Sequence, residues 1–238
     1  MEHLDHPYFS LFGKPRKYKT VLLFGAPGSG KGTQGKILSA IPGFYHSSTG
    51  DIFRSLDLSS AVGRTFWEYS SRGELVPAEL TIEVWKNYIK GMEMISQFHP
   101  ESEILILDGM PRNERQAELL DDTLDVVKII YLVSADMNKM VERLRRRALK
   151  ENRFDDANDK VIKNRLEVYE RDTKPVLDHY AQDKIMRLDA TMNQISVLTE
   201  ILKILGPIKS AIDHARDTAK RSGLAASKEE LVAAASRA

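Results

Sequence analysis

A glycine-rich segment that joins an apolar run to a helical pattern constrains this chain more than any other feature. Residues 25–34 read GAPGSGKGTQ and follow the run TVLLF at residues 20–24, which is typical of a buried strand. Residues 35–38 begin a helical pattern. A glycine-rich turn between a strand and a helix leaves backbone N–H groups free to surround a phosphate, with the helix N-terminus behind them. The segment therefore predicts a strand, a phosphate-binding turn and a helix, in that order.

The spacing of the glycines and Lys31 fits a P-loop, in which the lysine places a positive charge near the outer phosphates. Gly32 stands where Ser or Thr would bind Mg²⁺ directly, and Thr33 is the nearest hydroxyl. We expect the phosphate cradle to consist of Gly28, Ser29, Gly30, Lys31, Gly32 and Thr33. The chain is therefore expected to bind a nucleotide.

Composition argues against several classes of protein. The 238 residues include 35 Lys and Arg against 34 Asp and Glu, so no bulk charge points to nucleic acid or to a membrane surface. The absence of cysteine excludes a disulfide framework and a thiolate metal site, and it fits a reducing cytoplasm. No apolar run approaches the roughly 20 residues that span a bilayer, and residues 1–7 lack the pattern of a signal peptide. We expect a soluble, cytoplasmic protein with no nucleic-acid or membrane partner.

Three further short apolar runs predict strands, at residues 104–107, 126–133 and 184–188. Helical patterns lie between them, which is the signature of parallel β-α-β units. Residues 49–95 contain helical patterns and no convincing strand, so we expect a small helical insert there. These features predict an α/β fold with a doubly wound parallel sheet of about five strands, and ligands in the crevice at its carboxyl edge.

The second half of the chain predicts two helices around a polar loop. Residues 136–147 have apolar positions spaced to face a core, whereas residues 148–159 are polar and break that pattern, which predicts a loop or lid. A long helix is expected over residues 160–180, and Pro175 should bend or split it near Lys174.

The two ends of the chain are expected to lie outside the main domain. Residues 195–205 predict the last helix of the core, and the composition changes after residue 206. Residues 207–238 are rich in Ala, Lys, Arg and Ser, and we expect them to form a peripheral extension, as residues 1–17 do at the other end. The main domain is therefore predicted to span residues 18–206.

Asp108 follows the apolar run 104–107, so we expect it at the carboxyl end of a strand beside the strand of the P-loop. A carboxylate there can hold Mg²⁺ through water, as the aspartate of a Walker B motif does. The alternative is a turn residue, since Asp-Gly is common in turns. Because Asp108 is expected to lie beside a P-loop, we expect it to hold Mg²⁺ through water.

Arginines gather on both sides of the polar loop. Arg112 and Gln116 are four residues apart and share a helix face, so the guanidinium can clamp a phosphate while the amide contacts a neighbouring base edge. The other candidates flank the loop: Arg143, Arg147, Arg153 and Arg165. Arg145 and Arg146 are expected to be solvated. Phosphoryl transfer explains such a set, because the transferred group spreads negative charge over its oxygens and water must be kept from it.

Five sequence motifs, taken in order, point to one family. They are GAPGSGKGTQ at residues 25–34, STGDIFR at 48–54, RGELVP at 72–77, DGMPR at 108–112 and RFDD at 153–156. In this order they resemble the adenylate kinase family, and the match runs from about residue 18 to residue 206. Only five residues separate the last arginine before the polar loop from the first one after it, which is similar to the short-lid form of the family.

The resemblance implies reversible phosphoryl transfer from MgATP to AMP by a monomer, giving two ADP. It implies an insert of about residues 49–80 that binds the monophosphate, and a lid of about residues 147–160 that is too short to carry zinc. For AMP it implies contacts by Thr49, Arg54, Gly73, Val76, Arg112 and Gln116. For ATP it implies the P-loop and Arg143, with Asp108 holding Mg²⁺ through water. The set that neutralises the phosphates is then Lys31, Arg112, Arg147, Arg153 and Arg165.

Some positions depart from the family pattern. Met110 stands between Gly and Pro-Arg, where the family usually has an aromatic residue. Ala190 stands where the family often has glycine near the ATP adenine. Residues 148–152 lack the glycines of other short lids, which predicts a stiffer hinge. None of these changes removes a charged group that the reaction requires.

The acceptor base is the least constrained part of the prediction. Asn113, directly after Pro-Arg, resembles kinases that accept UMP or CMP, whereas Thr49 and Gln116 favour adenine. The alternatives are therefore a UMP/CMP kinase of the same fold and a non-catalytic nucleotide-binding sensor that engages a partner through its C-terminal extension.

Overall fold

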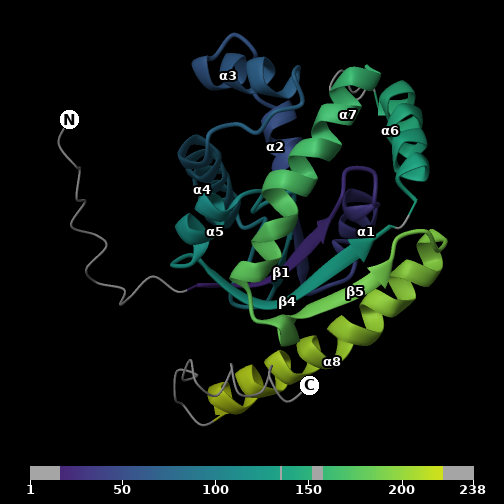
Figure 1. Ribbon diagram of the computed structural model, residues 1–238. Helices are drawn as coiled ribbons and strands as arrows, with labels where there is room; N and C mark the ends of the chain where they lie inside the picture. The colour runs from purple at the N-terminus through teal and green to yellow at the C-terminus, as the bar shows by residue number, and fades with distance from the viewer. Residues whose placement is uncertain (1–16, 135, 152–157, 222–238) are drawn as a thin grey trace.

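The computed structural model describes residues 17–134, 136–151 and 158–221. Its centre is a five-stranded parallel sheet in the order β2-β3-β1-β4-β5 (Figure 1). The strands are β1 (Tyr18–Gly25), β2 (Phe44–Ser48), β3 (Ile104–Asp108), β4 (Leu124–Val133) and β5 (Ile185–Asp189). The prediction of an α/β fold with a doubly wound parallel sheet is confirmed.

Helices join the strands and cover both faces of the sheet. They are α1 (Lys31–Leu38), α2 (Thr49–Arg54), α3 (Ala61–Ser70), α4 (Ala78–Met94), α5 (Glu114–Leu120), α6 (Met137–Glu151), α7 (Asp159–Val168) and α8 (Gln194–Arg221). After α7 the chain forms a π-helical turn, η3 (Tyr169–Thr173), and two short 3-10 helices, η4 (Lys174–His179) and η5 (Gln182–Lys184). Within the described ranges, none of the helices combines the length and apolarity that a membrane span requires.

Alternate residues of β1 pack on opposite faces of the sheet. Leu22 and Phe24 belong to one buried cluster with side chains of α4, α5 and α7, whereas Val21 and Leu23 belong to a second cluster with α1 and α8. All four side chains are at most 3% exposed. Figure 1 shows the consequence, with α8 below the sheet and α7 above it. A strand buried on both faces needs a continuous apolar run, which is why the sequence predicted it.

The direction of the chain across the sheet reverses at β1. This strand pairs with β3 on one side and with β4 on the other. The chain adds β2 and β3 on the first side before it crosses to β4 and β5 on the second. Leu23 is in register with Asp108, which brings the carboxyl ends of β1 and β3 together. Open α/β sheets bind ligands in the crevice at such a reversal.

β2 is a strand that the sequence analysis did not locate. It lies at the edge of the sheet and pairs only with β3, from Phe44 to Ser48. Three of its five residues, His46, Ser47 and Ser48, are polar, so it lacks the apolar run that marks the central strands. Its place in the sheet is set by pairing with β3 rather than by its own pattern.

α6 is longer than predicted. The expected helix ended at Arg147, but the structure continues it to Glu151, so the predicted loop is wrong for residues 148–151. Those residues are Ala, Leu, Lys and Glu, which all favour helices and include no Gly or Pro. The tip of the predicted lid, residues 152–157, lies outside the described residues.

The long helix expected over residues 160–180 is split, as Pro175 predicted. α7 begins at Asp159 behind the N-cap Asn158 and ends at Val168, where the π-helical turn begins. Pro175 then occupies the first turn of η4, where its missing N–H costs no hydrogen bond.

α8 also continues past its predicted end. The sequence predicted a helix over residues 195–205, but α8 is a single helix of 28 residues with Pro207 inside it. Ile208 and Ile212 are buried in the same cluster as Val197 and the earlier apolar positions of this helix. The apolar face keeps its helical spacing across the change in composition, so the prediction that the helix ends at residue 205 is wrong.

Removing the side chain of Ile212 tests whether this part of α8 belongs to the core. We expect Ile212→Ala to lower the free energy of unfolding by about 2–5 kcal/mol, because a side chain that is 2% exposed leaves a cavity. Urea unfolding followed by circular dichroism measures the change.

Ile195→Ala is the matched control, since Ile195 lies on the same helix but is 76% exposed. Its effect should stay within about 0.5 kcal/mol. Equal losses in the two variants would contradict the packing of the second half of α8 against the sheet.

Candidate active site

A cleft of about 490 Å³ opens at the carboxyl edge of the sheet. All the site residues expected from the sequence lie on its wall, apart from Arg153, which falls outside the described residues. The residues brought together are Gly28, Ser29, Gly30, Lys31, Gly32, Thr33, Thr49, Arg54, Gly73, Val76, Asp108, Arg112, Gln116, Arg143, Arg147 and Arg165. They come from the P-loop turn, the insert, the end of β3, and helices α5, α6 and α7.

The P-loop turn holds Lys31 at the base of the cleft. Its ammonium donates to the carbonyl oxygens of Gly25, at 2.6 Å, and Ala26, at 3.0 Å, so the side chain folds back over the turn. Gly28 has a positive φ of 83°, and a Cβ there would lie 2.8 Å from the carbonyl oxygen of Met140 in α6. Only glycine satisfies both requirements, so α6 packs directly on the turn.

Positive charge converges on Lys31. The pKa of Lys31 is lowered to about 8, mainly by burial and also by the guanidinium groups of Arg112, Arg147 and Arg165, while Asp108 acts in the opposite direction. Three arginines from α6, α7 and the loop after β3 therefore act on one ammonium. A site with this charge is suited to phosphate groups, which would restore the positive form of Lys31.

Asp108 lies where the sequence placed it, at the end of β3 and next to the P-loop. Asp108 is 7% exposed, and its Oδ2 is 3.4 Å from the point that a Cβ on Gly32 would occupy. His46 Nε2 is 3.9 Å from the same oxygen and, among the described residues, has no hydrogen-bond partner. A single carboxylate oxygen beside a phosphate cradle is a donor set that fits Mg²⁺, which keeps several waters and also binds substrate phosphates.

Gln116 and Asn113 form a reciprocal cap at the start of α5. The side-chain oxygen of Asn113 accepts from the backbone N–H of Gln116 at 2.9 Å, and Gln116 Oε1 accepts from the backbone N–H of Arg112 at 2.8 Å. The second bond assigns the orientation of the buried amide, because only its oxygen can accept. Within the described residues no hydrogen bond occupies Gln116 Nε2, so this donor is available to a ligand. Asn113, the residue that resembled pyrimidine kinases, acts here as a helix cap.

Arg112 is held at two points besides this cap. Its Nε donates to the carbonyl oxygen of Gly109 at 2.6 Å. Its own carbonyl oxygen accepts from the hydroxyl of Thr173, in the π-helical turn, at 2.8 Å. These bonds fix the backbone and the base of the guanidinium, so the charged end is directed along the cleft wall.

The insert contributes a polar and an aromatic wall. Thr49 is 4% exposed, and within the described residues its hydroxyl has no hydrogen-bond partner. Arg54 Nη2 is 2.5 Å from Asp51 Oδ1 one turn earlier in α2. Phe53 and Phe66 stack with ring centroids 5.3 Å apart, and both line the cleft. Sequence reasoning missed the two phenylalanines because they come from different helices, α2 and α3.

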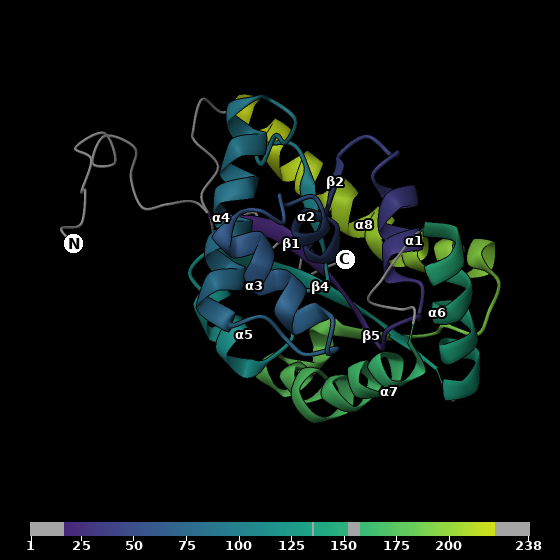
Figure 2. The same cartoon turned by 90° about the horizontal axis from the view of Figure 1, so that it is seen from above.

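A second part of the cleft lies between α6 and the segment before α8. Arg143 Nη1 donates to the carbonyl oxygen of Ala190 at 2.9 Å, and Met192 and Val197 add apolar surface. Seen from above, α3 of the insert and α6 lie on opposite sides of the molecule, and α7 runs between them (Figure 2). The cleft therefore has two parts beside the P-loop turn, one lined by the insert and one lined by α6 and the start of α8.

α6 brings two more cations to the cleft, and one of them, Lys150, lies in the part of the helix beyond its predicted end. Arg146 and Lys150 both line it, although Arg146 was expected to be only solvated. Lys150 is seven residues after Arg143, which is two helical turns, so the spacing was a usable signal once the helix was known to continue. Arg145 instead forms a two-bond ion pair with Asp159 of α7, at 2.8 and 2.7 Å.

Known proteins resemble this chain over most of its length. The family model described as adenylate kinase matches residues 23–185. An adenylate kinase of Corynebacterium urealyticum is 37% identical over 178 residues, which cover 71% of this chain and 90% of the relative. One of Synechococcus sp. (strain WH7803) is 35% identical over 187 residues, covering 76% and 95%. Adenylate kinase isoenzyme 1 of Homo sapiens is 33% identical over 198 residues, covering 82% and 98%.

The lowered pKa of Lys31 predicts that nucleotide binding depends on pH. Phosphates favour the charged ammonium, so below pH 8 the ligand meets a lysine that is already protonated, and above it binding must take up a proton. Affinity for a nucleoside triphosphate should therefore be nearly constant near pH 7 and fall by up to about tenfold per pH unit above pH 8. Equilibrium titrations between about pH 7 and about pH 9.5 measure this.

Lys31→Arg separates this effect from other titrations, because a guanidinium stays charged throughout the range. Its affinity, whatever its absolute value, should not fall over the same interval. A decline of equal steepness in both proteins would contradict the assignment to Lys31.

Proposed function

The chain belongs to the adenylate kinase family, and on that premise we propose that it transfers a phosphoryl group reversibly from MgATP to AMP, giving two ADP. The observation that carries the proposal is the convergence of Lys31, Arg112, Arg147 and Arg165 in a cleft that also contains Gln116. Cations from four segments surround one point, between a P-loop and a base-sized pocket. Phosphoryl transfer between two nucleotides needs this arrangement.

The proposed donor occupies the P-loop and the part of the cleft next to Arg143. Its phosphates would lie against the turn at residues 28–33 and the ammonium of Lys31. The apolar side chains of Met192 and Val197 suit the face of a base. Asp108 would hold hydrated Mg²⁺, whose contribution when bound is to neutralise charge on the phosphate oxygens and orient them.

The proposed acceptor lies between Arg112, Arg54 and the aromatic wall of the insert. Arg112 would hold its phosphate, because two hydrogen bonds fix its position beside Lys31. No covalent intermediate is required. An oxygen of the acceptor phosphate attacks the terminal phosphorus of the donor in line, the bond from that phosphorus to the bridging oxygen breaks, and ADP leaves. The arginines neutralise the charge on the transferred group. Arg153 belongs to the proposed set but lies outside the described residues.

The orientation of Gln116 supports adenine as the acceptor base. Its Nε2 is a donor, and Oε1 keeps one lone pair, so the amide matches an edge with an acceptor beside a donor. Adenine offers that edge at N1 and N6. In guanine and uracil the acceptor is the exocyclic oxygen and the donor is the ring N–H, so these bases match the same amide only when turned over in the pocket. Cytosine offers the same pair as adenine from a smaller ring, which leaves the surface of Phe53 and Phe66 less well covered. CMP is therefore the closest competitor.

Exclusion of water is the remaining requirement, because water would otherwise accept the phosphoryl group. The insert of about residues 49–80 and the lid of about residues 147–160 are proposed to close over the two nucleotides. Arg147 and Arg165 lie on the two helices that lead into that lid, so closure would bring them to the phosphates. Such motions limit turnover in many enzymes.

We further propose that the enzyme works as a monomer in the cytoplasm. The absence of cysteine suits a reducing compartment. All the described candidate residues come from one chain and line one cleft, so the site needs no contribution from a second copy.

Acceptor preference tests the proposed function directly. With MgATP as donor, we expect ADP formation with AMP to exceed transfer to GMP or UMP by about a hundredfold or more, because the wrong base leaves a buried amide unpaired. Chromatography of the products from AMP, CMP, UMP and GMP, offered separately, measures this. Preference for UMP or CMP would favour the pyrimidine kinase, and absence of transfer with bound ATP would favour the sensor.

Arg112, which is proposed to clamp the acceptor phosphate, gives a second test. Arg112→Ala should lower kcat/KM for AMP by about a hundredfold or more while the protein stays folded, because a preorganised cation beside Lys31 is lost.

Arg115→Ala is the matched control, since Arg115 lies three residues away, pairs with Glu79 and Glu118, and is 56% exposed. It should change kcat/KM by less than about threefold. Full activity of the Arg112 variant would overturn the proposed acceptor geometry.

A further inference from the structure

One turn of the insert lies directly on α7. Gly73 has a positive φ of 73°, and a Cβ there would be 2.8 Å from the carbonyl oxygen of Val161 and 3.0 Å from Cγ of Arg165. The backbone of the turn therefore approaches α7 more closely than any side chain would allow. Because Gly73 also lines the cleft, the surface that faces the acceptor and the surface that packs on α7 belong to the same residue.

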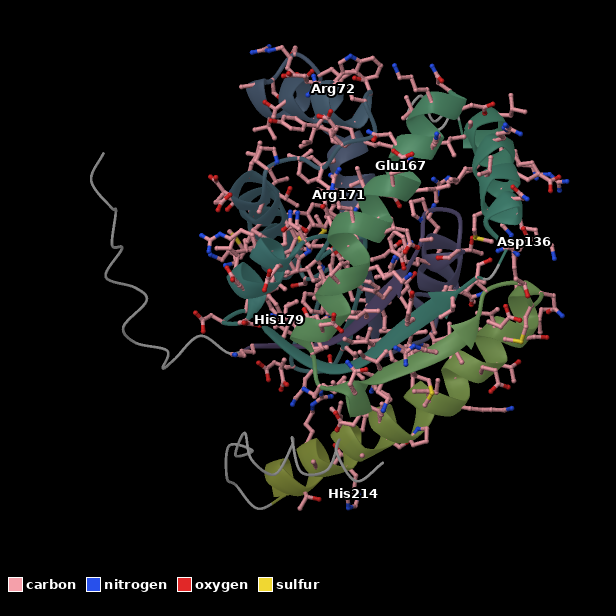
Figure 3. The ribbon with its side chains drawn as sticks, in the orientation of Figure 1. Arg72, Asp136, Glu167, Arg171, His179 and His214 are labelled. Carbon is pink, nitrogen blue, oxygen red and sulfur yellow. The ribbon has the colours of Figure 1, made fainter. Side chains whose placement is uncertain are left out.

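A hydrogen bond from α7 holds this turn. Asn164 Nδ2 donates to the backbone carbonyl oxygen of Arg72 at 2.6 Å. Figure 3 shows Arg72 after α3, on the side of the insert near α7. The guanidinium of Arg72 is engaged within the insert, 3.3 Å from Glu68 and 3.0 Å from Glu74. Asn164 therefore bonds to a turn that is already held by ion pairs within the insert.

The same stretch of chain also holds Arg112, which is proposed to clamp the acceptor phosphate. Thr173, in the π-helical turn that continues α7, donates to the carbonyl oxygen of Arg112 at 2.8 Å. α7 and η3 thus bond to the acceptor pocket on two sides, at the insert turn through Asn164 and at the clamp through Thr173. Arg165, next to Asn164 in the sequence, lies on the cleft wall.

We propose that Asn164 is a positioning residue that couples binding of the acceptor to the placement of Arg165. This inference rests on the proposed function, in which AMP occupies the insert pocket. AMP fixes the turn at Gly73, and the hydrogen bond from Asn164 then holds α7 against that turn, with Arg165 beside the phosphates. A donor nucleotide that engages Arg165 favours the same docked arrangement. Since such linkage is reciprocal, each nucleotide should tighten the binding of the other through this contact.

The coupling is measured by equilibrium binding rather than by turnover. AMP affinity is determined by calorimetry with and without a saturating, non-hydrolysable ATP analogue, and the ratio of the two dissociation constants is the coupling. In the wild-type protein we expect AMP to bind about threefold to tenfold more tightly with the analogue, which is the range of one neutral hydrogen bond. In Asn164→Ala the ratio should fall close to one, with little change in the affinity for the analogue alone.

Lys163→Ala is the matched control. Lys163 is adjacent to Asn164, but its side chain is 80% exposed and lies 3.7 Å from Glu167 on the outer face of α7. This variant should keep the wild-type ratio. Thermal unfolding of all three proteins shows whether Asn164→Ala remains folded, which a surface amide on an intact helix predicts.

The outcomes separate the inference from the proposed function. If AMP does not bind the wild-type protein, the proposed acceptor is wrong and the inference fails with it. If AMP binds and the wild-type ratio persists in Asn164→Ala, or is already one in the wild type, the coupling role of Asn164 is overturned while the acceptor stands. Loss of the ratio in Asn164→Ala alone supports the inference.

Discussion

The burial of Lys31 among other cations is the constraint on which the site depends. Its ammonium bonds only to the carbonyl oxygens of Gly25 and Ala26 among the described contacts, while three arginines act on it and Asp108 is the one opposing charge. Burial is the largest cause of the lowered pKa of Lys31, and the three arginines add to it while Asp108 opposes it. Such a site is stabilised by anions of matching geometry, and phosphates provide both the charge and the oxygen acceptors. The substrates therefore complete the electrostatics that the fold leaves unbalanced.

The fold divides these charges between rigid and peripheral elements. Lys31 and Asp108 lie at the carboxyl edge of a sheet whose central strands are buried on both faces. Arg147 and Arg165 come from α6 and α7, which pack against that edge and lead into the proposed lid. Because like charges repel strongly at short range, a permanently assembled cluster would be costly. Bound phosphates would offset that cost, and the proposed closure would bring the cations on α6 and α7 closer to them.

The sequence predicted the parts of the molecule whose pattern is local. TVLLF and the glycine-rich turn predicted β1 and the P-loop, and Pro175 predicted the break near Lys174, where the π-helical turn gives way to a 3-10 helix. β2 was not predicted, because an edge strand is defined by pairing with its neighbour and the polar residues His46 to Ser48 form no apolar run. α6 and α8 extend beyond their predicted ends because helix propensity in α6 and apolar spacing in α8 outweigh the change in composition.

Site geometry was less predictable than site membership. The i, i+4 spacing of Arg112 and Gln116 indicated a shared face, but not that the amide oxygen of Gln116 accepts a hydrogen bond from the Arg112 backbone. In the same way, RGELVP marks Gly73 as a turn, whereas the carbonyl oxygen of Val161 that requires a glycine there is almost ninety residues away. Motifs record which side chains meet a ligand. The contacts that orient them join distant segments, so they follow only from the folded chain, and Asn164 belongs to that second group.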